Sequence, residues 1–100
     1  MSKHLTMHVS TSTAPVVKLT GEGSSVYVYF QPGVKIARTV NKSTWPVVNI
    51  DLAADGSVVG VEAVGLPEFT LQYVLDQAGL KVPVSVAKQA RYLHAESVSA

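Results

Sequence analysis

Apolar and polar residues alternate most clearly over residues 47–64, which read VVNIDLAADGSVVGVEAV and contain an Asp-Gly pair near their centre. Alternation with a period of two is typical of a strand with one buried face, and Asp-Gly favours a two-residue hairpin turn of the primed type. The pattern therefore predicts a hairpin in which Ala54 faces Ser57 and Val47 faces Val64. Its apolar face carries Val48, Ile50, Leu52, Val59, Val61 and Ala63, and its polar face carries Asn49, Asp51, Gly60 and Glu62.

Upstream of this hairpin, residues 26–30 form a second alternating segment of strand type. The sequence Gln31-Pro32-Gly33 then turns the chain into another β candidate at 34–40. A three-residue loop would set Val28 opposite Ile36 and keep apolar residues together, whereas a two-residue loop would mix the two faces. We therefore expect these two segments to form a hairpin with the three-residue loop.

Three further segments are less regular. Residues 16–20 form a short β candidate that ends in a turn rich in glycine and serine. Residues 1–12 alternate over a few positions and suit either an edge strand or a tail. Residues 41–46 are mostly polar and end in an X-Pro step, so we expect a connection between two hairpins there.

After the last β candidate, the period of the apolar residues changes to that of an α-helix. The apolar positions of one helical face are Leu71, Val74, Leu75 and Ala78. This spacing predicts a helix that starts just past Pro67, and Gly79 is positioned to end it with a left-handed cap. A second, weaker helical segment is expected at 85–96, with Lys88 and Arg91 on its basic side.

These elements predict an α+β fold, in which an antiparallel β-meander of four to six strands carries one or two C-terminal helices packed on its apolar face. A chain of 100 residues is long enough for one core and too short for two, so we expect a single domain over residues 1–100. Residues 13–65 would form the meander and residues 66–97 the helical segment.

Composition narrows the classes of function. Apolar residues make up 47% of the chain and charged residues only 15%, so part of the apolar surface is expected to meet a partner. A net charge of +1 gives no long-range field that would attract nucleic acid, and the lack of cysteine removes disulfides and thiolate chemistry. The sequence has no stretch typical of a signal peptide or a membrane span, so we expect a cytoplasmic protein without a membrane partner.

The polar face of the 47–64 hairpin carries the first candidate functional residues. Asp51 and Glu62 are diagonal neighbours there, close enough to share a cation or a proton in a metal-dependent or acid-base enzyme. Outward carboxylates are more commonly part of a solvated sheet face, and Asp55 is explained by the turn. We therefore expect no catalytic, cofactor-binding or metal-binding residue. Gly60 faces Asp51 and leaves its carboxylate room to turn toward a neighbour.

A second surface candidate consists of Tyr27, Tyr29 and Lys35, which would share one face of the expected hairpin. Aromatic rings beside basic groups on a sheet can stack and neutralise single-stranded nucleic acid. Tyrosines on strands are more commonly ordinary half-buried β residues. Nucleic-acid binding is therefore an alternative to the main expectation.

One part of the chain is similar to a known family. The residues that carry the likeness are Val26-Tyr27-Val28, Lys35 to Val40, and Asp51, Asp55, Gly56, Val59, Gly60, Val61 and Glu62. In these positions the run from Val26 to Val64 resembles the domain-of-unknown-function family numbered 2283, which comprises small bacterial and phage proteins. The resemblance implies a small β-meander with a helix, of bacterial or phage origin. It implies no activity and no catalytic residue.

The strand edges suggest what such a protein does. A meander leaves two edges that need protection or a partner. We therefore expect a small non-enzymatic protein-interaction module of bacterial or phage type, which self-associates or binds a protein partner through a sheet edge or a helix face. A homo-oligomer is the expected assembly, with a dimer favoured.

Overall fold

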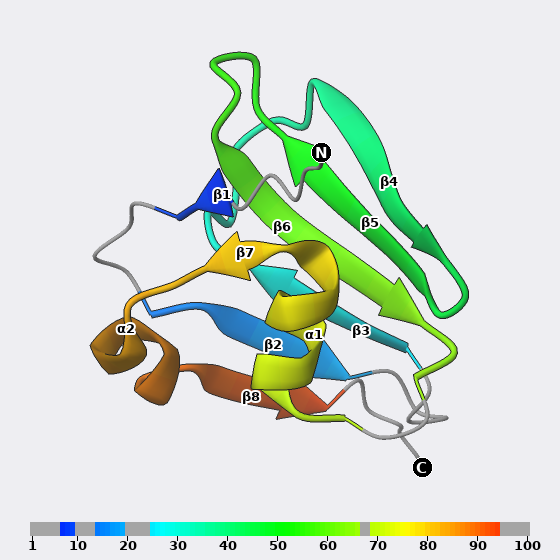
Figure 1. The fold of residues 1–100 in the computed structure, drawn as a ribbon. Helices are drawn as coiled ribbons and strands as arrows, with labels where there is room; N and C mark the ends of the chain where they lie inside the picture. Colours follow the sequence, from blue (N-terminus) through cyan, green and yellow to red (C-terminus); the bar gives the residue numbers. More distant parts are fainter. Residues whose placement is uncertain (1–6, 10–13, 20–24, 67–68, 95–100) are drawn as a thin grey trace, which may run out of the picture.

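The computed structural model describes residues 7–9, 14–19, 25–66 and 69–94. Figure 1 shows a twisted sheet of six strands with one helix, α1 (Leu71–Ala78), lying across one of its faces. Across the sheet the strands follow in the order β4 (Arg38–Thr44), β5 (Val47–Leu52), β6 (Val58–Val64), β3 (Ser25–Tyr29), β2 (Val16–Leu19) and β8 (Arg91–His94). The remaining elements are the short parallel strands β1 (Met7–His8) and β7 (Leu80–Lys81) and the short helix α2 (Val84–Lys88).

The predicted α+β class is confirmed, but the sheet is an antiparallel meander only in part. β4, β5 and β6 follow one another as antiparallel hairpins, and β3 lies beside β6 rather than beside β4. This is a Greek-key order, in which residues 30–37 pass along one end of the sheet to reach β4. β8 then joins β2 in the parallel direction, so the sheet is mixed.

The predicted hairpin between 26–30 and 34–40 is wrong. β3 pairs with β2 and β6, and the side chains of Val34 and Ile36 are 40% and 45% exposed. The reason is burial, because β6 offers β3 a strand whose residues are almost all buried, whereas the chain from Arg38 onward is polar and suits an edge.

The predicted connection at 41–46 is wrong for the same reason. Its first four residues continue β4, and only Trp45 and Pro46 form the turn into β5, with a cis peptide bond between them. A polar stretch can be a strand when it lies at a sheet edge and has solvent beside it. The pairing shifts between Asn41 and Ser43, which leaves Lys42 in a β-bulge.

The hairpin over residues 47–64 has the predicted register from Val47 opposite Val64 to Asp51 opposite Gly60. Its turn is not the predicted two-residue loop. The Ala53 N–H donates to Ser57 O over 2.9 Å and Gly56 has φ +87°, the geometry of a three-residue loop with glycine in the left-handed position.

A β-bulge absorbs the additional loop residue. Leu52 pairs with Val58 instead of Val59, and the register returns at Asp51 and Gly60. Asp55 accepts hydrogen bonds from the Ser57 hydroxyl at 2.6 Å and the Ser57 N–H at 2.9 Å, which hold the pKa of the Asp55 carboxyl below its ordinary value. Its assignment to the turn therefore agrees with the contacts.

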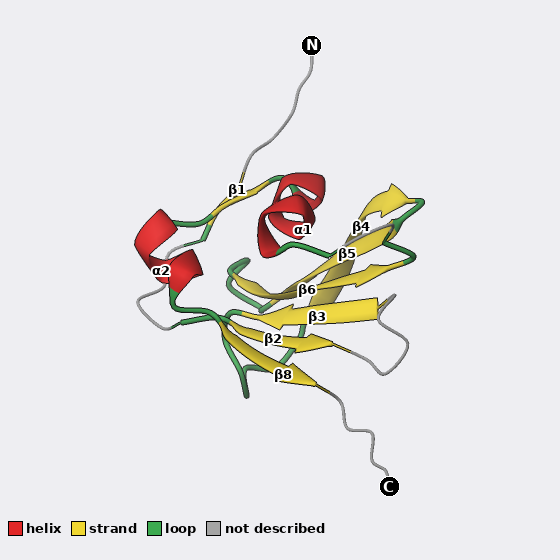
Figure 2. Ribbon diagram, turned by 90° about the horizontal axis from the view of Figure 1, so that it is seen from below, coloured by secondary structure: helices red, strands yellow, loops and turns green. Residues whose placement is uncertain are grey.

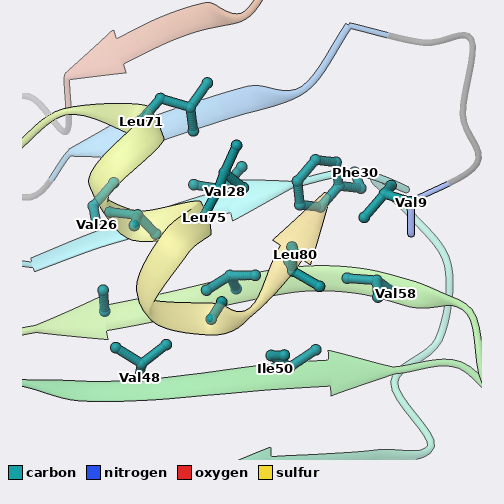
Figure 3. Packing of buried hydrophobic residues seen from close by; sticks show 14 of the residues in the cluster. Val9, Val26, Val28, Phe30, Val48, Ile50, Val58, Leu71, Leu75 and Leu80 are labelled. Atoms are coloured by element: carbon teal, nitrogen blue, oxygen red, sulfur yellow. The ribbon is translucent and has the colours of Figure 1, made fainter. Parts of the chain in front are cut away.

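Helix α1 covers the apolar face of the sheet, as the spacing predicts. Its buried residues are Leu71, Val74, Leu75 and Ala78. Figure 3 shows Leu71 and Leu75 of this helix above the apolar side chains of the sheet, in one cluster that extends past Phe30. Gly79 ends the helix with φ +71°, and Thr70 Oγ1 begins it by accepting from the Tyr73 N–H at 3.0 Å. Pro67, expected just before the helix, lies outside the described residues.

The second predicted helix, at 85–96, is largely wrong. α2 spans only Val84–Lys88 and has no buried residue, and the chain then forms β8. A weak helical pattern gives way here because residues 91–94 can pair with the otherwise open edge of β2. Residues 95 and 96 lie outside the described part.

The N-terminal alternation at 1–12 is described only over residues 7–9. There β1 pairs in parallel with β7, and the Val9 N–H donates to Lys81 O over 2.9 Å. This part is a strand within the chain's own fold rather than a tail. Over the described ranges, every helix falls short of the length and apolar character that a membrane crossing would need.

Candidate functional site on the outer face of the sheet

Figure 2 shows that α1 lies on one side of the six-stranded sheet, and the opposite face is called the outer face below. Most of the predicted site residues alternate with core residues along their strands and therefore lie on the outer face. The strand registers align its side chains in two rows that cross the sheet. One row is Thr39, Asp51, Gly60, Tyr29, Val16 and Arg91. The next row is Asn41, Asn49, Glu62, Tyr27, Lys18 and Leu93.

Asp51 is the one buried charged residue among those described, at 9% exposure. Its two carboxylate oxygens accept hydrogen bonds from two hydroxyl groups on different strands. Thr39 Oγ1 on β4 donates to Oδ1 over 2.5 Å, and the Tyr27 hydroxyl on β3 donates to Oδ2. A carboxylate removed from water needs such donors, so these contacts account for its burial.

Gly60 leaves the space that the contact between Tyr27 and Asp51 needs. Tyr27 lies opposite Glu62, yet its ring leans across β6 toward Asp51 and occupies the space above Gly60. A Cβ at Gly60 would lie 2.7 Å from the Tyr27 hydroxyl oxygen and 2.7 Å from Val28 O. The pairing of Gly60 with Asp51 is as predicted, and the room that glycine leaves is filled by the ring of Tyr27.

Tyr27 is therefore a fixed hydrogen-bond donor. Burial, and after it the hydrogen bond to Asp51, raises the pKa of the Tyr27 hydroxyl well above its ordinary value. The phenol stays protonated at physiological pH. Its ring also packs against that of Tyr29, with 4.3 Å between the ring centroids and an angle of 45° between the planes.

Asp51 and Glu62, the candidate enzymatic pair, have different surroundings. Asp51 directs both oxygens to hydroxyl groups, whereas Glu62 is exposed on the outer face. No hydrogen bond joins the two carboxylates, and the described part of the chain has no group of three or more potential metal ligands. The geometry thus gives Asp51 a structural role.

The expected grouping of Lys35 with the two tyrosines depends on a hairpin that does not form. Lys35 lies exposed in the connection between β3 and β4, outside any strand. The cations that share the outer face with the tyrosines are instead Lys18, directly opposite Tyr27, and Arg91, one strand beyond Val16. The alternation at 16–20 could have revealed Lys18, but nothing in the sequence indicated that Arg91 would reach this face through a parallel strand.

Lys18 and Arg91 are both exposed. Within the described ranges, neither side chain has a hydrogen-bond acceptor or a carboxylate within ion-pair distance. The polar groups at the other side of the sheet are paired, since Asn41 Nδ2 donates to Asn49 Oδ1 over 2.8 Å and to Ser43 O over 2.9 Å. The Asp51 carboxylate and the asparagines of the outer face therefore have partners, whereas Lys18 and Arg91 have none in the described part.

The two edges of the sheet also differ. β4 is polar and interrupted by the bulge at Lys42. At the other edge, no described strand pairs with the far side of β8, where Tyr92 is 50% and Leu93 48% exposed. Val84, 69% exposed, shares a shallow hollow of about 220 Å³ with Tyr92 at this edge.

Comparisons with protein-family models, with curated proteins and with solved structures find no match for this chain. The resemblance to the family numbered 2283 thus stays a prediction. A function for this protein can therefore be argued only from the contacts, burial and charges of its described residues.

Proposed function

We propose that this protein is a non-enzymatic interaction module that forms a symmetric dimer by pairing the β8 edges of two copies. The observation that carries this proposal is the open, apolar edge of β8. Of the six large apolar residues that are exposed in the described part, three belong to this edge, namely Val84, Tyr92 and Leu93. Unpaired strand groups beside apolar side chains are a common template for association.

The backbone of β8 has hydrogen-bonding groups on the side that no described strand pairs with. The Arg91 N–H donates to Pro15 O over 2.9 Å, so Arg91 directs its backbone groups toward β2. Because backbone groups alternate along a strand, Leu93 also faces β2, whereas the N–H and C=O groups of Tyr92 and His94 face away from it. These outward groups can serve an added antiparallel strand.

One register satisfies both the backbone and the side chains. If Leu93 lies opposite Leu93 of a second copy on the two-fold axis, Tyr92 of each copy lies opposite His94 of the other. The outward backbone groups then form hydrogen bonds in both directions. The two Leu93 side chains meet on the outer face, while Tyr92 and Val84 flank the junction on the other face.

The β4 edge is a poorer candidate for the same contact. A bulge in an edge strand interrupts regular pairing with another chain. Lys42 lies in such a bulge, and the Asn41 side chain already donates to neighbouring strand residues. Pairing through β8 also leaves the apolar cluster under α1 undisturbed.

Sedimentation velocity across the micromolar range tests the proposal. We expect wild-type protein to shift from monomer to dimer as concentration rises, and the variant Leu93→Lys to stay monomeric because two like charges would meet on the axis. Ile36→Lys is the matched control, since Ile36 is 45% exposed against 48% for Leu93 and lies away from β8. This control should dimerise like the wild type.

A backbone variant provides a second test. Tyr92→Pro removes an N–H that faces away from β2, so it costs no hydrogen bond with any described strand but blocks the added strand. Circular dichroism should show that it keeps the wild-type fold while it remains monomeric. A wild type that stays monomeric at every concentration, or a dimer unaffected by both β8 variants, would contradict the proposal.

A further inference from the structure

The half of the outer face formed by β3, β2 and β8 carries two cations beside two packed aromatic rings. Lys18 lies directly opposite Tyr27, and Arg91 lies in the same row as Tyr29, separated from it by Val16. Both cations are exposed and lack an anionic partner in the described part of the chain.

The nearest acidic group in these rows is Glu62. Tyr27 separates it from Lys18, so the two lie two strands apart, a distance of about 10 Å between backbones. Asp51 is farther from Lys18 and Arg91, and its oxygens are already occupied by hydroxyl groups. Among the described residues, the β2 and β8 side of the outer face is therefore locally positive, although the whole chain has a net charge of only +1.

Pairing of two β8 edges would join two such halves. In the register with Leu93 on the axis, one row runs Tyr27, Lys18, Leu93, and then Leu93, Lys18, Tyr27 of the second copy. With about 4.8 Å between strands, the two Lys18 residues lie about 14 Å apart and the two Tyr27 residues about 24 Å apart. The two Arg91 residues flank this row.

We infer that this joined surface, called the basic-aromatic strip and made of Lys18, Tyr27, Tyr29 and Arg91 from each copy, binds single-stranded nucleic acid. The inference rests on the dimer proposed above. Lys18 and Arg91 neutralise phosphates, and the rings of Tyr29 provide stacking surface for bases. Tyr27 supports this surface, because Asp51 holds its hydroxyl and its ring packs against Tyr29.

The dimensions suit a short stretch of an extended strand. The distance between the outer tyrosines corresponds to about four nucleotides, at the lower end of the site sizes of single-strand binding domains. A sulfated polysaccharide would satisfy the cations but has no base to stack on tyrosine. The pairing of cations with aromatic rings therefore favours nucleic acid over other polyanions.

Fluorescence anisotropy with a labelled oligothymidylate of about twelve nucleotides tests the inference. For a single strand, each neutralised phosphate contributes about −0.7 to the slope of log K against log salt, so four cations predict a slope of about −3. The monomeric variant Tyr92→Pro should bind more weakly, with a slope about half as steep.

Substitutions distinguish the contribution of the basic-aromatic strip to binding from the effect of the protein's net charge. Lys18→Gln combined with Arg91→Gln should lower affinity at least about tenfold at low salt. Lys42→Gln combined with Arg38→Gln removes the same net charge on β4 at the opposite edge of the sheet, and should keep most of the affinity. Tyr29→Leu keeps an apolar side chain on β3 but removes stacking, and should weaken binding by about tenfold.

The outcomes distinguish this inference from the dimer itself. A wild-type dimer that fails to bind the oligonucleotide would overturn the inference and leave the dimer standing. Binding by a strictly monomeric wild type, with Tyr92→Pro unchanged, would overturn both the dimer and the joined strip. Equal binding of heparin together with an unaffected Tyr29→Leu variant would show a general polyanion surface, and would overturn recognition of nucleic acid.

Discussion

The two halves of the outer face use polar residues in opposite ways. Around Asp51 on β5, polar side chains bond to one another, because Thr39 on β4 and Tyr27 on β3 both donate to its carboxylate. Over β2 and β8, Lys18 and Arg91 have no such partner among the described residues. The partnered groups are engaged within the fold, whereas the two cations are available to a ligand.

This difference has an energetic basis. Asp51 is buried, and its carboxyl group is tolerated in that position because hydroxyl groups replace the lost water. Removing either donor hydroxyl group, or filling the space above Gly60 that the Tyr27 ring occupies, should therefore reduce the stability of the fold. Exposed cations make no such demand, so their removal should change binding and leave stability nearly unchanged.

The largest loss of stability is expected for Gly60→Ala. The new Cβ would clash with both the ring of Tyr27 and the fixed backbone oxygen of Val28, so we expect the free energy of unfolding to fall by about 3 kcal/mol. Urea denaturation measures this change. Gly56→Ala is the control, because its Cβ would meet nothing within 4 Å and only its positive φ would cost about 1 kcal/mol. Equal losses in the two variants would refute the role of Tyr27 above Gly60.

A smaller loss is expected for Tyr27→Phe. This change keeps the ring but removes one donor from the buried carboxylate of Asp51, at a cost of about 1 to 2 kcal/mol. Urea denaturation near neutral pH gives the value. Thr39→Val removes the other hydroxyl and serves as the comparison, since it should also destabilise the protein.

Tyr27→Phe should also flatten the dependence of stability on alkaline pH. The pKa of Tyr27 is raised in the folded state above the ordinary value of about 10, so the unfolded chain loses this proton first. The stabilisation is complete below pH about 10 and is lost as pH rises beyond it. Denaturation at pH about 8 and about 11 should thus show a steeper decline for wild type than for the variant. Equal losses of stability in the wild type and the variant would contradict the raised pKa of Tyr27.

The smallest effect on stability is expected for Lys18→Gln combined with Arg91→Gln. Both side chains are exposed and unpaired, so the free energy of unfolding should change by no more than about 0.5 kcal/mol. A chemical denaturation curve of the double variant measures it. A loss as large as that of Tyr27→Phe would mean that these cations stabilise the fold, and the contrast between the two halves would disappear.

Patterns that involve neighbouring residues could be read from the sequence. The hairpin register near Val47, the buried face of α1 and the cap at Gly79 each depend on local spacing, and each agrees with the structure. The loop at Asp55 could not be predicted in detail, since the Asp-Gly pair also suits a three-residue loop and the β-bulge near Val59 restores the register.

The pairing of strands that lie far apart in the sequence could not be predicted from the sequence. β3 pairs with β6 because both bury apolar residues, and β8 pairs with β2 because that edge is available. The same limit applies to the site. Asp51 could be placed on the polar face, but its contact with Tyr27 requires β3 to lie beside β6 and a glycine between them.

Trp45 has a practical consequence for spectroscopy. It is the single tryptophan of the chain and is 77% exposed. Trp45 lies in the turn between β4 and β5, and its ring lies over Gly65, which follows β6. Figure 1 places that turn far from β8 across the sheet. Intrinsic tryptophan fluorescence will therefore follow the unfolding of this hairpin while it remains insensitive to events at the opposite edge, which gives the protein its own optical reporter for one half of the sheet.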